Sequence, residues 1–365
     1  MANCQLEQTD TKVLDEAHGD KWSLYHGDCC ELIKALPDAS IDYVWSSLPF
    51  LSIFVYSPSE RDVGNCRNSD EFWQHFAYLT DELYRVMKPG RICSIHCMNV
   101  PTSKQNHGFI GIQDFRGDII RDFQRAGFIY HSEAVIHRDP VVDMQRTKAL
   151  GLLHKQVKKD SCMSRQGIPD TMLQFAKDYV GDEIKGDATT ALLRLINDVL
   201  PSCKIDFRKG GENAEPVSGE FKEFYGDASM MTYSSMQSSV DGEEYTDSAK
   251  STRKSIDIWQ RYADPIWMDI DRSDTLQFKA ARTDDDGRHV CPAQIGAVKR
   301  SMDMFSNPGD TVLDPFNGVG TTGHAALQMG RRYIGFELKD SYFKQAVKNL
   351  TDTEASAKQP QLELN

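Results

Sequence analysis

The chain has 365 residues, of which 40% are hydrophobic, and a formal net charge of −12. This acidity excludes a protein that coats nucleic acid non-specifically, but it does not exclude a local basic cleft, because phosphates respond to nearby charge. The polar N-terminus has no signal-peptide core and no apolar run could span a membrane, so we expect an intracellular protein that binds no membrane. Nine scattered cysteines, without matched Cys-x-x-Cys pairs, indicate reduced thiols rather than a zinc site.

Strand and helix patterns alternate in the first part of the chain. Residues 1–20 are polar and are predicted to be a loose leader, and residues 21–143 are predicted to form part of a sheet domain. The predicted strands are 22–26, 41–45, 91–97 and 128–137, and the predicted helices are 31–36, 70–87 and 117–126. Such alternation is typical of a doubly wound α/β sheet with helices on both faces.

Residues 144–254 break this pattern and are predicted to be an inserted region. Between 145 and 168, six basic residues oppose only Asp160, and we expect them to contact phosphates, with a solvated helix face as the alternative. These six are Arg146, Lys148, Lys155, Lys158, Lys159 and Arg165. An amphipathic helix is predicted within 178–200, and an acidic, flexible segment is predicted over 212–247.

The regular pattern returns over residues 255–351, and 352–365 are predicted to be a polar tail. The predicted elements are a helix over 292–305, a strand over 311–313, a helix over 324–329, a strand over 333–337 and a helix over 342–350. Gly318, Gly320 and Gly323 lie between the first strand and the helix that follows it, and Glu337 follows about 20 residues after Gly318. A strand, a glycine-rich turn and a helix N-terminus are typical of a site for an adenosine-type cofactor, with the acid on the ribose. The alternative is a tight turn without a ligand.

The position of this motif argues against a nicotinamide-dependent oxidoreductase, which is kept as an alternative. A nicotinamide-binding unit usually begins its domain, whereas only about 40 residues follow Gly323. The other strands of the sheet must therefore come from earlier in the chain. The sequence predicts a permuted Rossmann-like sheet whose cofactor motif is C-terminal.

With this order of motifs, the chain resembles the DNA amino-methyltransferases that use S-adenosyl-L-methionine, in the class whose catalytic motif precedes the cofactor motif. It is similar in particular to bacteriophage-borne members. The resemblance implies a class I methyltransferase fold with 21–143 as the catalytic half, 144–254 as a target-recognition region and 255–351 as the cofactor-binding half. The cofactor-binding residues that it implies are Asp28, Asp314, Phe316, Gly318, Gly320, Thr321, Thr322 and Glu337.

Ser47, Leu48, Pro49 and Phe50 resemble the catalytic tetrapeptide of this family. An exocyclic amine of a base is a poor nucleophile, because its lone pair is delocalised into the ring, and hydrogen bonds accepted from its two protons localise that pair. The resemblance implies the Ser47 hydroxyl and the Leu48 carbonyl as the two acceptors, while Phe50 offers a face on which a flipped base stacks. Leu48 replaces the proline of the family, which keeps the carbonyl and removes some rigidity.

A serine at the first motif position favours N4 of cytosine as the target, with N6 of adenine as the alternative. Methylation at C5 of cytosine is disfavoured, because the sequence has no Pro-Cys dipeptide. No metal is expected, since a sulfonium methyl donor is already activated. The resemblance implies double-stranded DNA as the partner, a role in DNA methylation such as restriction–modification, and a place in the cytoplasm of a bacterium or a phage-infected cell. A monomer and a homodimer stay open, as do an RNA or protein methyltransferase and a catalytically inactive DNA-binding relative.

Overall fold

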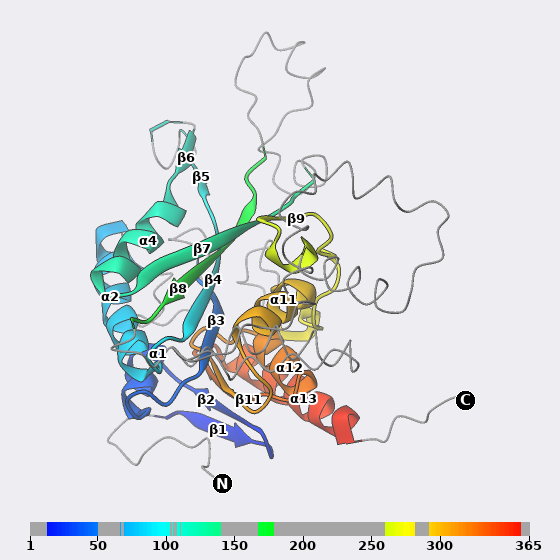
Figure 1. Cartoon of the computed structure of the whole chain (residues 1–365). Helices are drawn as coiled ribbons and strands as arrows, with labels where there is room; N and C mark the ends of the chain where they lie inside the picture. The colour runs from blue at the N-terminus through cyan, green and yellow to red at the C-terminus, as the bar shows by residue number, and fades with distance from the viewer. Residues whose placement is uncertain are drawn as a thin grey trace, which may run out of the picture. The chain divides into compact units, whose positions relative to one another are not determined.

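The computed structural model of the chain describes residues 13–49, 66, 69–102, 104, 108–109, 111–139, 167–178, 260–281 and 292–358. It contains a nine-stranded sheet of order β1-β2-β11-β10-β3-β4-β8-β7-β9 and a two-stranded hairpin, β5-β6 (Figure 1). The sheet and its helices belong to one compact unit, Met1–Ala191 together with Pro265–Asn365. Among the described helices, none has the length and apolarity that crossing a membrane requires.

Five parallel strands form the centre of the sheet. In spatial order they are β2 (Trp22–His26), β11 (Arg332–Glu337), β10 (Thr311–Asp314), β3 (Tyr43–Ser47) and β4 (Ile92–Met98). Most of their residues are buried, because helices cover both faces and such strands have no solvent side. Since β11 and β10 come from late in the chain and lie between early strands, the sheet is permuted as predicted.

Further strands extend the sheet on both sides. At one edge, β1 (Asp15–His18) pairs antiparallel with β2. At the other side, β8 (Asp170–Ala176) lies antiparallel between β4 and β7 (Ile129–Ile136), and β9 (Ile266–Trp267) runs beside β7. The hairpin of β5 (Val100–Thr102) and β6 (Gly111–Gln113) follows β4 in the chain.

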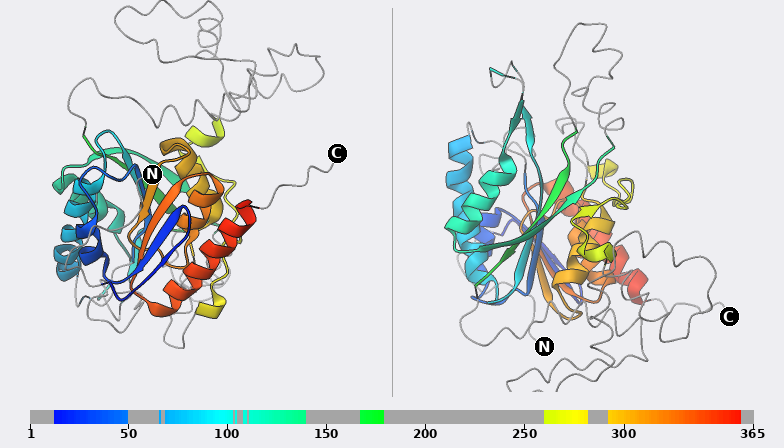
Figure 2. Two further views of the ribbon diagram at one scale, coloured as in Figure 1. Left: turned by 90° about the horizontal axis from the view of Figure 1, so that it is seen from below. Right: turned by 45° about the horizontal axis from the view of Figure 1, so that its top comes forward.

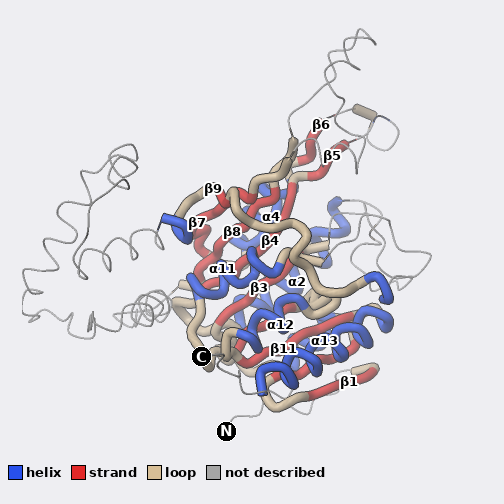
Figure 3. The backbone as a smooth tube through the Cα atoms, turned by 90° about the vertical axis from the view of Figure 1, so that its right-hand side faces the viewer, coloured by secondary structure: helices blue, strands red, loops and turns tan. Residues whose placement is uncertain are grey.

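Helices cover both faces of the sheet, as the sequence predicts (Figures 1 and 2). One face carries α1 (Cys29–Leu32), the adjoining 3₁₀ turn Ile33–Ala35, α2 (Ser69–Val86) and α4 (Phe115–Arg125). The other face carries α11 (Ile295–Phe305), α12 (Thr321–Gln328) and α13 (Asp340–Lys358), which lie in front of the strands in Figure 3. The expected apolar stripe of α2 is buried against the sheet and consists of Phe72, Phe76, Leu79, Leu83 and Val86.

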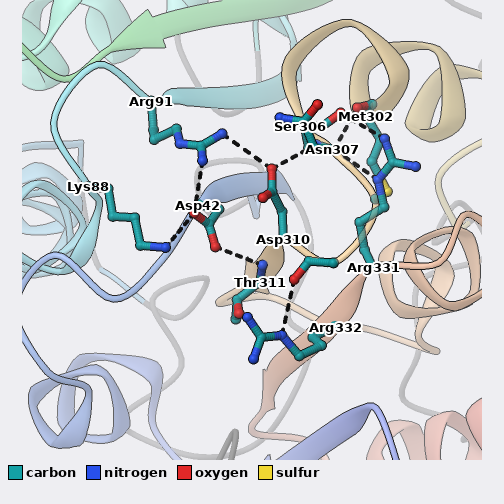
Figure 4. Close-up of polar contacts among 11 residues, drawn as sticks. Asp42, Lys88, Arg91, Met302, Ser306, Asn307, Asp310, Thr311, Arg331 and Arg332 are labelled. Carbon is teal, nitrogen blue, oxygen red and sulfur yellow. Dashed lines mark hydrogen bonds and ion pairs between the residues drawn. The ribbon is translucent and has the colours of Figure 1, made fainter. Parts of the chain in front are cut away.

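A charge network joins the amino ends of β3, β4 and β10 (Figure 4). Asp42 accepts hydrogen bonds from Lys88 Nζ at 2.5 Å, from Arg91 Nη2 at 3.1 Å and from the backbone N–H of Thr311 at 2.9 Å. Arg91 Nη1 also donates to Asp310 Oδ2 at 3.2 Å. The network therefore holds the early and late parts of the chain together by charge as well as by strand pairing.

The turn between β1 and β2 lies against the last helix. Glu354 Oε1 of α13 accepts hydrogen bonds from the backbone N–H groups of Asp20, at 2.9 Å, and Lys21, at 3.2 Å. The first strand and the last helix of the described fold are thus neighbours.

The structure differs from the predicted elements in several places, and β5, β6 and β9 are strands that the sequence does not predict. Residues 15–18 of the predicted loose leader form β1, a short and largely exposed strand without an apolar pattern. Residues 170–176, inside the predicted insertion, form β8, because Leu173 and Phe175 pack into the core between two other strands. The predicted tail begins too early, since α13 continues to Lys358 through residues that are mostly exposed. The helix and the acidic segment predicted within the insertion lie outside the described residues.

Candidate functional site

The carboxyl ends of the five parallel strands meet at one edge of the sheet, which we name the site edge. β10 ends there at Asp314, β11 at Glu337 and β3 at Ser47. From β10 the chain continues to β11 on one side, and from β3 it continues to β4 on the other, so the strand order reverses between β10 and β3. Ligands of open α/β sheets bind at the carboxyl ends of the strands beside such a switch point.

Asp314 joins the glycine-rich loop to the end of β3. Its carboxylate is buried and accepts hydrogen bonds from Ser46 Oγ at 2.7 Å, Thr322 Oγ1 at 2.5 Å and the backbone N–H of Phe316 at 3.0 Å. Burial raises the pKa of Asp314 to about 6, although the three hydrogen bonds favour the carboxylate. The buried carboxylate of Asp314 therefore fixes the conformation of the loop through its hydrogen bonds to Phe316 and Thr322.

The three glycines of the loop serve different structural needs. Gly318 has a φ of +56°, and a Cβ there would meet no atom within 4 Å, so this position faces open space. Gly320 has a φ of +89° and is the N-cap of α12, where the left-handed backbone favours glycine. Gly323 is packed inside, because a Cβ there would lie 2.6 Å from Tyr333 Cε1 and 2.7 Å from Leu350 Cδ2. Of the three, Gly318 combines backbone freedom with room for a ligand.

Other residues of the predicted cofactor motif support the loop. Thr321 and Thr322 begin α12 and are buried, and Phe316 is half-buried against the core. Asn317 accepts a hydrogen bond from the Tyr333 hydroxyl at 2.7 Å. The loop is thus held on its inner side by polar contacts to neighbouring strands.

Glu337 holds the loop from the adjacent strand. Its Oε2 accepts a hydrogen bond from the Gly318 N–H at 2.7 Å, and its Oε1 accepts one from the Lys339 N–H at 2.8 Å. Asp28 follows the next strand, β2, where its Oδ1 accepts a hydrogen bond from the Cys30 N–H at 2.9 Å and so caps α1. The structure therefore brings Glu337 and Asp28 to neighbouring positions of the site edge.

The predicted catalytic tetrapeptide begins at the end of β3. Ser47 Oγ lies 3.2 Å from His96 Nδ1, and the two residues are register partners on β3 and β4. Leu48 is 2% exposed and packs in the core, and Pro49 is buried. Phe50 lies outside the described residues. The core packing of Leu48 therefore anchors the motif directly beside Ser47.

All six basic residues predicted to contact DNA lie outside the described residues, but the chain on either side of them is described. β7 ends at Ile136 and β8 begins at Asp170, and these two residues are partners in the sheet. Asp170 also pairs with Met98 at the carboxyl end of β4. The chain thus leaves the sheet and returns to it at the site edge, on either side of the basic segment.

Four residues beside the motif escape the sequence-based prediction. Ser46 binds Asp314, as described above, and His96, Asp170 and Arg138 form a polar chain that leads away from Ser47. For His96 a signal exists, a histidine within an otherwise apolar strand. No signal marks Asp170, because the strand that carries it was not predicted.

Asp28, Cys29 and Cys30 form the one group among the described residues whose ligand atoms lie close enough to hold a metal ion, within 4.8 Å of one another. A hydrogen bond with Cys30, together with burial, raises the pKa of the Cys29 thiol. A metal ion binds the thiolate, so this environment disfavours binding. We assign no metal to this group.

The site edge suits an adenosine-type cofactor in two respects. The open space at Gly318 lets a ligand approach the backbone closely. Next to this opening, the carboxylate of Glu337 is half-buried and oriented by the loop, and a carboxylate can accept both hydroxyl protons of a ribose.

Comparisons with known proteins find matches among DNA methylases. A family model of DNA methylases, N6_N4_Mtase, matches residues 41–348. The DNA adenine methyltransferase YhdJ of Escherichia coli (strain K12) is 47% identical over 53 residues, which are 14% of this chain and 18% of YhdJ. The aligned segment therefore spans less than a fifth of the length of that relative.

Two solved structures share the fold. The PvuII DNA methyltransferase, which is cytosine-N4-specific, is 16% identical, with 92% of each chain covered and a TM-score of 0.51. TTHA0409 of Thermus thermophilus, a presumed DNA modification methylase solved with S-adenosyl-L-methionine, is 18% identical, with 90% of this chain and 93% of that chain covered and a TM-score of 0.52. At these identities the likeness shows the fold, a Rossmann-like class I methyltransferase sheet. Since the family model covers most of the sequence, the chain belongs to the DNA methylase family of N6 and N4 methyltransferases.

Proposed function

We propose that this protein transfers a methyl group from S-adenosyl-L-methionine to the exocyclic amine of a flipped-out DNA base, with N4 of cytosine as the favoured target. The observation that carries the proposal is the 2.7 Å hydrogen bond between Ser46 and Asp314. It joins the residue directly before the proposed catalytic tetrapeptide to the start of the glycine-rich loop. The group that accepts the methyl and the group that donates it would therefore be held side by side.

For the cofactor, we assign Glu337 to the ribose hydroxyls and the open backbone at Gly318 to the adenosine part. The other expected cofactor-binding residues at the site edge are Asp28, Asp314, Phe316, Gly320, Thr321 and Thr322. S-adenosyl-L-methionine supplies a methyl group on a sulfonium, which is already activated, so the reaction needs no metal. The match to the DNA methylase family, together with the cofactor complex of TTHA0409, supports this assignment.

For the amine, we assign Ser47 Oγ and the backbone carbonyl of Leu48 as the two hydrogen-bond acceptors. Together they localise the lone pair on the amine nitrogen and orient it for attack. The side chain of Leu48 is held in the core, so its carbonyl keeps a defined direction without a proline ring. Phe50 would stack on the flipped base.

The choice of base rests on Ser47. A serine at this position favours N4 of cytosine, and the matched segment of YhdJ, a DNA adenine methyltransferase, supports N6 of adenine as the second candidate. Digestion of methylated DNA to nucleosides, followed by mass spectrometry, distinguishes N4-methylcytosine from N6-methyladenine. Detection of the adenine product alone would reverse our preference.

For the duplex, we assign the basic residues between β7 and β8 to the phosphates. These are Arg146, Lys148, Lys155, Lys158, Lys159 and Arg165. The two described flanks of this segment, at Ile136 and Asp170, lie at the site edge, which supports this assignment. Phosphate contacts position a protein on DNA without reading its sequence. Recognition of a particular DNA sequence therefore requires other contacts, to the edges of the bases.

Incorporation of a tritiated methyl group from S-adenosyl-L-methionine into duplex DNA tests the proposal. We expect incorporation by the wild type and a loss of about 10²-fold or more in Ser47→Ala, with S-adenosylhomocysteine binding unchanged. Ser356→Ala, on an exposed part of α13, is the matched control and should keep the wild-type rate. Cofactor binding without incorporation into any DNA would indicate an inactive relative, stronger methylation of RNA would indicate another acceptor, and stabilisation by NAD alone would indicate an oxidoreductase.

A further inference from the structure

A chain of polar side chains leads from Ser47 into the protein. Ser47 Oγ lies 3.2 Å from His96 Nδ1, and His96 Nε2 lies 3.8 Å from Asp170 Oδ2. Arg138 Nη1 donates a hydrogen bond of 2.7 Å to Asp170 Oδ1. His96 is 7% exposed and Asp170 is 6% exposed, so both are shielded from bulk water, whereas the side chain of Arg138 is 16% exposed.

Packing alone does not account for His96. Its ring stacks on Trp45 with a centroid distance of 6.1 Å and an interplanar angle of 13°, which fixes the plane of the imidazole. An apolar ring would pack in the same way without burying two nitrogen atoms. Nε2 is buried with no hydrogen-bond partner among the described residues, and the carboxylate of Asp170 faces it at 3.8 Å. Buried polar atoms are costly unless they are paired, so such an atom calls for an explanation.

The charges around His96 set the direction of its hydrogen bonds. The ionisable groups that line it are Asp170 on β8 and, behind Asp170, Arg138 after β7, while Ser47 and Trp45 complete its surroundings from β3. Burial alone would raise the pKa of Asp170, but His96 and Arg138 lower it below its ordinary value, so Asp170 is ionised at neutral pH. Of the two neutral tautomers of His96, a carboxylate opposite Nε2 favours the one with its proton on Nε2. Nδ1 is then an acceptor, and Ser47 donates its hydroxyl proton to it.

We propose that His96 is a positioning residue for amine methylation, which acts through Ser47 and is oriented by Asp170. A serine hydroxyl both donates and accepts, and a hydroxyl that donated to the amine lone pair would block the reaction. By taking the hydroxyl proton, His96 leaves Ser47 Oγ with only its lone pairs for the amine. This inference rests on the proposed function, in which Ser47 binds the amine.

The same contacts give the leaving proton a route. The amine nitrogen carries two protons and has to lose one, because it gains a methyl group. Ser47 Oγ accepts that proton while its own hydroxyl proton passes to His96 Nδ1, so the serine is unchanged and the imidazole becomes imidazolium. Asp170 stabilises this cation until it returns the proton to water after product release. No oxidant or further reactant is involved, and each proton is accounted for.

A double-mutant cycle on single-turnover methylation tests the inference, with wild type, Ser47→Ala, His96→Gln and the double variant. We expect His96→Gln to lower the rate about 10²-fold with KM values for DNA and cofactor unchanged, and the double variant to be no slower than Ser47→Ala. His324→Gln is the matched control, since His324 Nδ1 also pairs with a hydroxyl, that of Thr353, at 2.7 Å.

Independent, multiplicative losses in the double variant would overturn the inference, as would a wild-type rate in His96→Gln. If His96→Gln does not fold, the cycle is repeated with Asp170→Asn, which keeps the imidazole and removes the charge that orients it, and the same outcomes apply. A failure of the proposed function is distinguishable, because it appears as an inactive wild type or as a fully active Ser47→Ala.

Discussion

Ser46 Oγ donates a 2.7 Å hydrogen bond to Asp314 Oδ1 across 268 positions of the sequence. The bond joins β3 to β10 where the strand order reverses, and Asp314 also binds Thr322 in the first turn of α12. A displacement of the glycine-rich loop is therefore transmitted to the end of β3. Group transfer depends on positions held to within about 1 Å, so under the proposed function this contact would couple the position of the cofactor to the methyl transfer.

Asp314 should make the stability of the protein depend on pH. Burial raises its pKa from 3.8 to about 6, so the folded state holds its proton over a range where the unfolded chain has lost it. Below about pH 4 both states are protonated and no penalty exists. As the pH rises to about 6, this group lowers the free energy of unfolding by on the order of 3 kcal/mol, at 1.36 kcal/mol per pKa unit.

The substitution Asp314→Asn isolates this contribution, because an amide does not titrate. The measurement is urea denaturation of both proteins between pH 4 and pH 6. We expect the free energy of unfolding of the wild type, relative to that of the variant, to fall over this range. Parallel pH dependences of the two proteins would show that Asp314 titrates normally.

Glu337→Ala should weaken cofactor binding. The substitution removes the carboxylate assigned to the ribose and the acceptor that orients the Gly318 N–H at 2.7 Å. Hydrogen bonds to a charged group contribute about 1.5–3 kcal/mol each, so we expect the Kd for S-adenosylhomocysteine to rise at least about 10-fold by calorimetry. Asp340→Ala, which removes an exposed carboxylate from α13, is the control and should leave the Kd unchanged. An unaltered Kd in Glu337→Ala would remove this residue from the site.

Alanine substitutions at Gly323 and Gly318 should affect different properties, chiefly stability at Gly323 and chiefly cofactor affinity at Gly318. Gly323→Ala forces a methyl against Tyr333 and Leu350, so it should destabilise the protein by about 1–3 kcal/mol through overpacking. Gly318→Ala meets no neighbouring atom and carries only the strain of a left-handed backbone, about 1–2 kcal/mol. Because the open face of Gly318 is the one assigned to the cofactor, we expect Gly318→Ala to show the larger loss of S-adenosylhomocysteine affinity. The reverse order of affinities would place the cofactor elsewhere.

Asp42→Ala should be strongly destabilising. Asp42 has a side chain that is 3% exposed, and its loss leaves Lys88 and Arg91 without a shared partner at the amino ends of the strands. Breaking a buried ion pair from one side costs about 3–5 kcal/mol. Asp38→Ala is a matched control, because Asp38 also binds an arginine but is 77% exposed, and such pairs contribute about 0–1 kcal/mol. Similar losses in thermal or urea denaturation for both variants would contradict this reading of the network.

Replacing Lys158 and Lys159 together by alanine should weaken DNA binding similarly for all sequences. Each lost phosphate contact reduces the slope of log K against log salt by about 1. Fluorescence anisotropy between low and moderate salt measures this slope. An unchanged affinity at low salt would mean that the duplex lies elsewhere on the protein.

The sequence predicts those parts of the molecule whose signal is local. The strands at 22–26 and 311–313 are short stretches rich in aromatic, β-branched and aliphatic residues. The glycine-rich loop and Ser47 belong to short motifs, and the order of these motifs in the chain leads to the permuted sheet. β1 and β8 escape prediction for different reasons. β1 is short and exposed, so it has no apolar pattern. β8 is a short apolar stretch between a basic segment and an acidic one, and the charged composition on both sides favours a loop prediction for the whole region.

The contacts of Ser46 and His96 could not be predicted, because they arise from strand pairing and not from spacing. Ser47 and His96 are 49 positions apart and meet because β3 and β4 pair in register. Asp170 reaches His96 because β8 lies antiparallel to β4. The spacing of residues in a single sequence does not show which strands pair or in which register.

The contact between Glu354 and the backbone of Asp20 has a consequence for the order of the motifs. The contact places α13 at the turn that follows β1, so a linker running back along β1 could join the end of α13 to Asp15, and the chain could be opened between Ala281 and Pro292 instead. Such a circular permutant would carry the glycine-rich loop before Ser47, while each strand kept its neighbours. Which motif comes first is therefore a property of where the backbone is cut, and the site depends only on how the strands are paired.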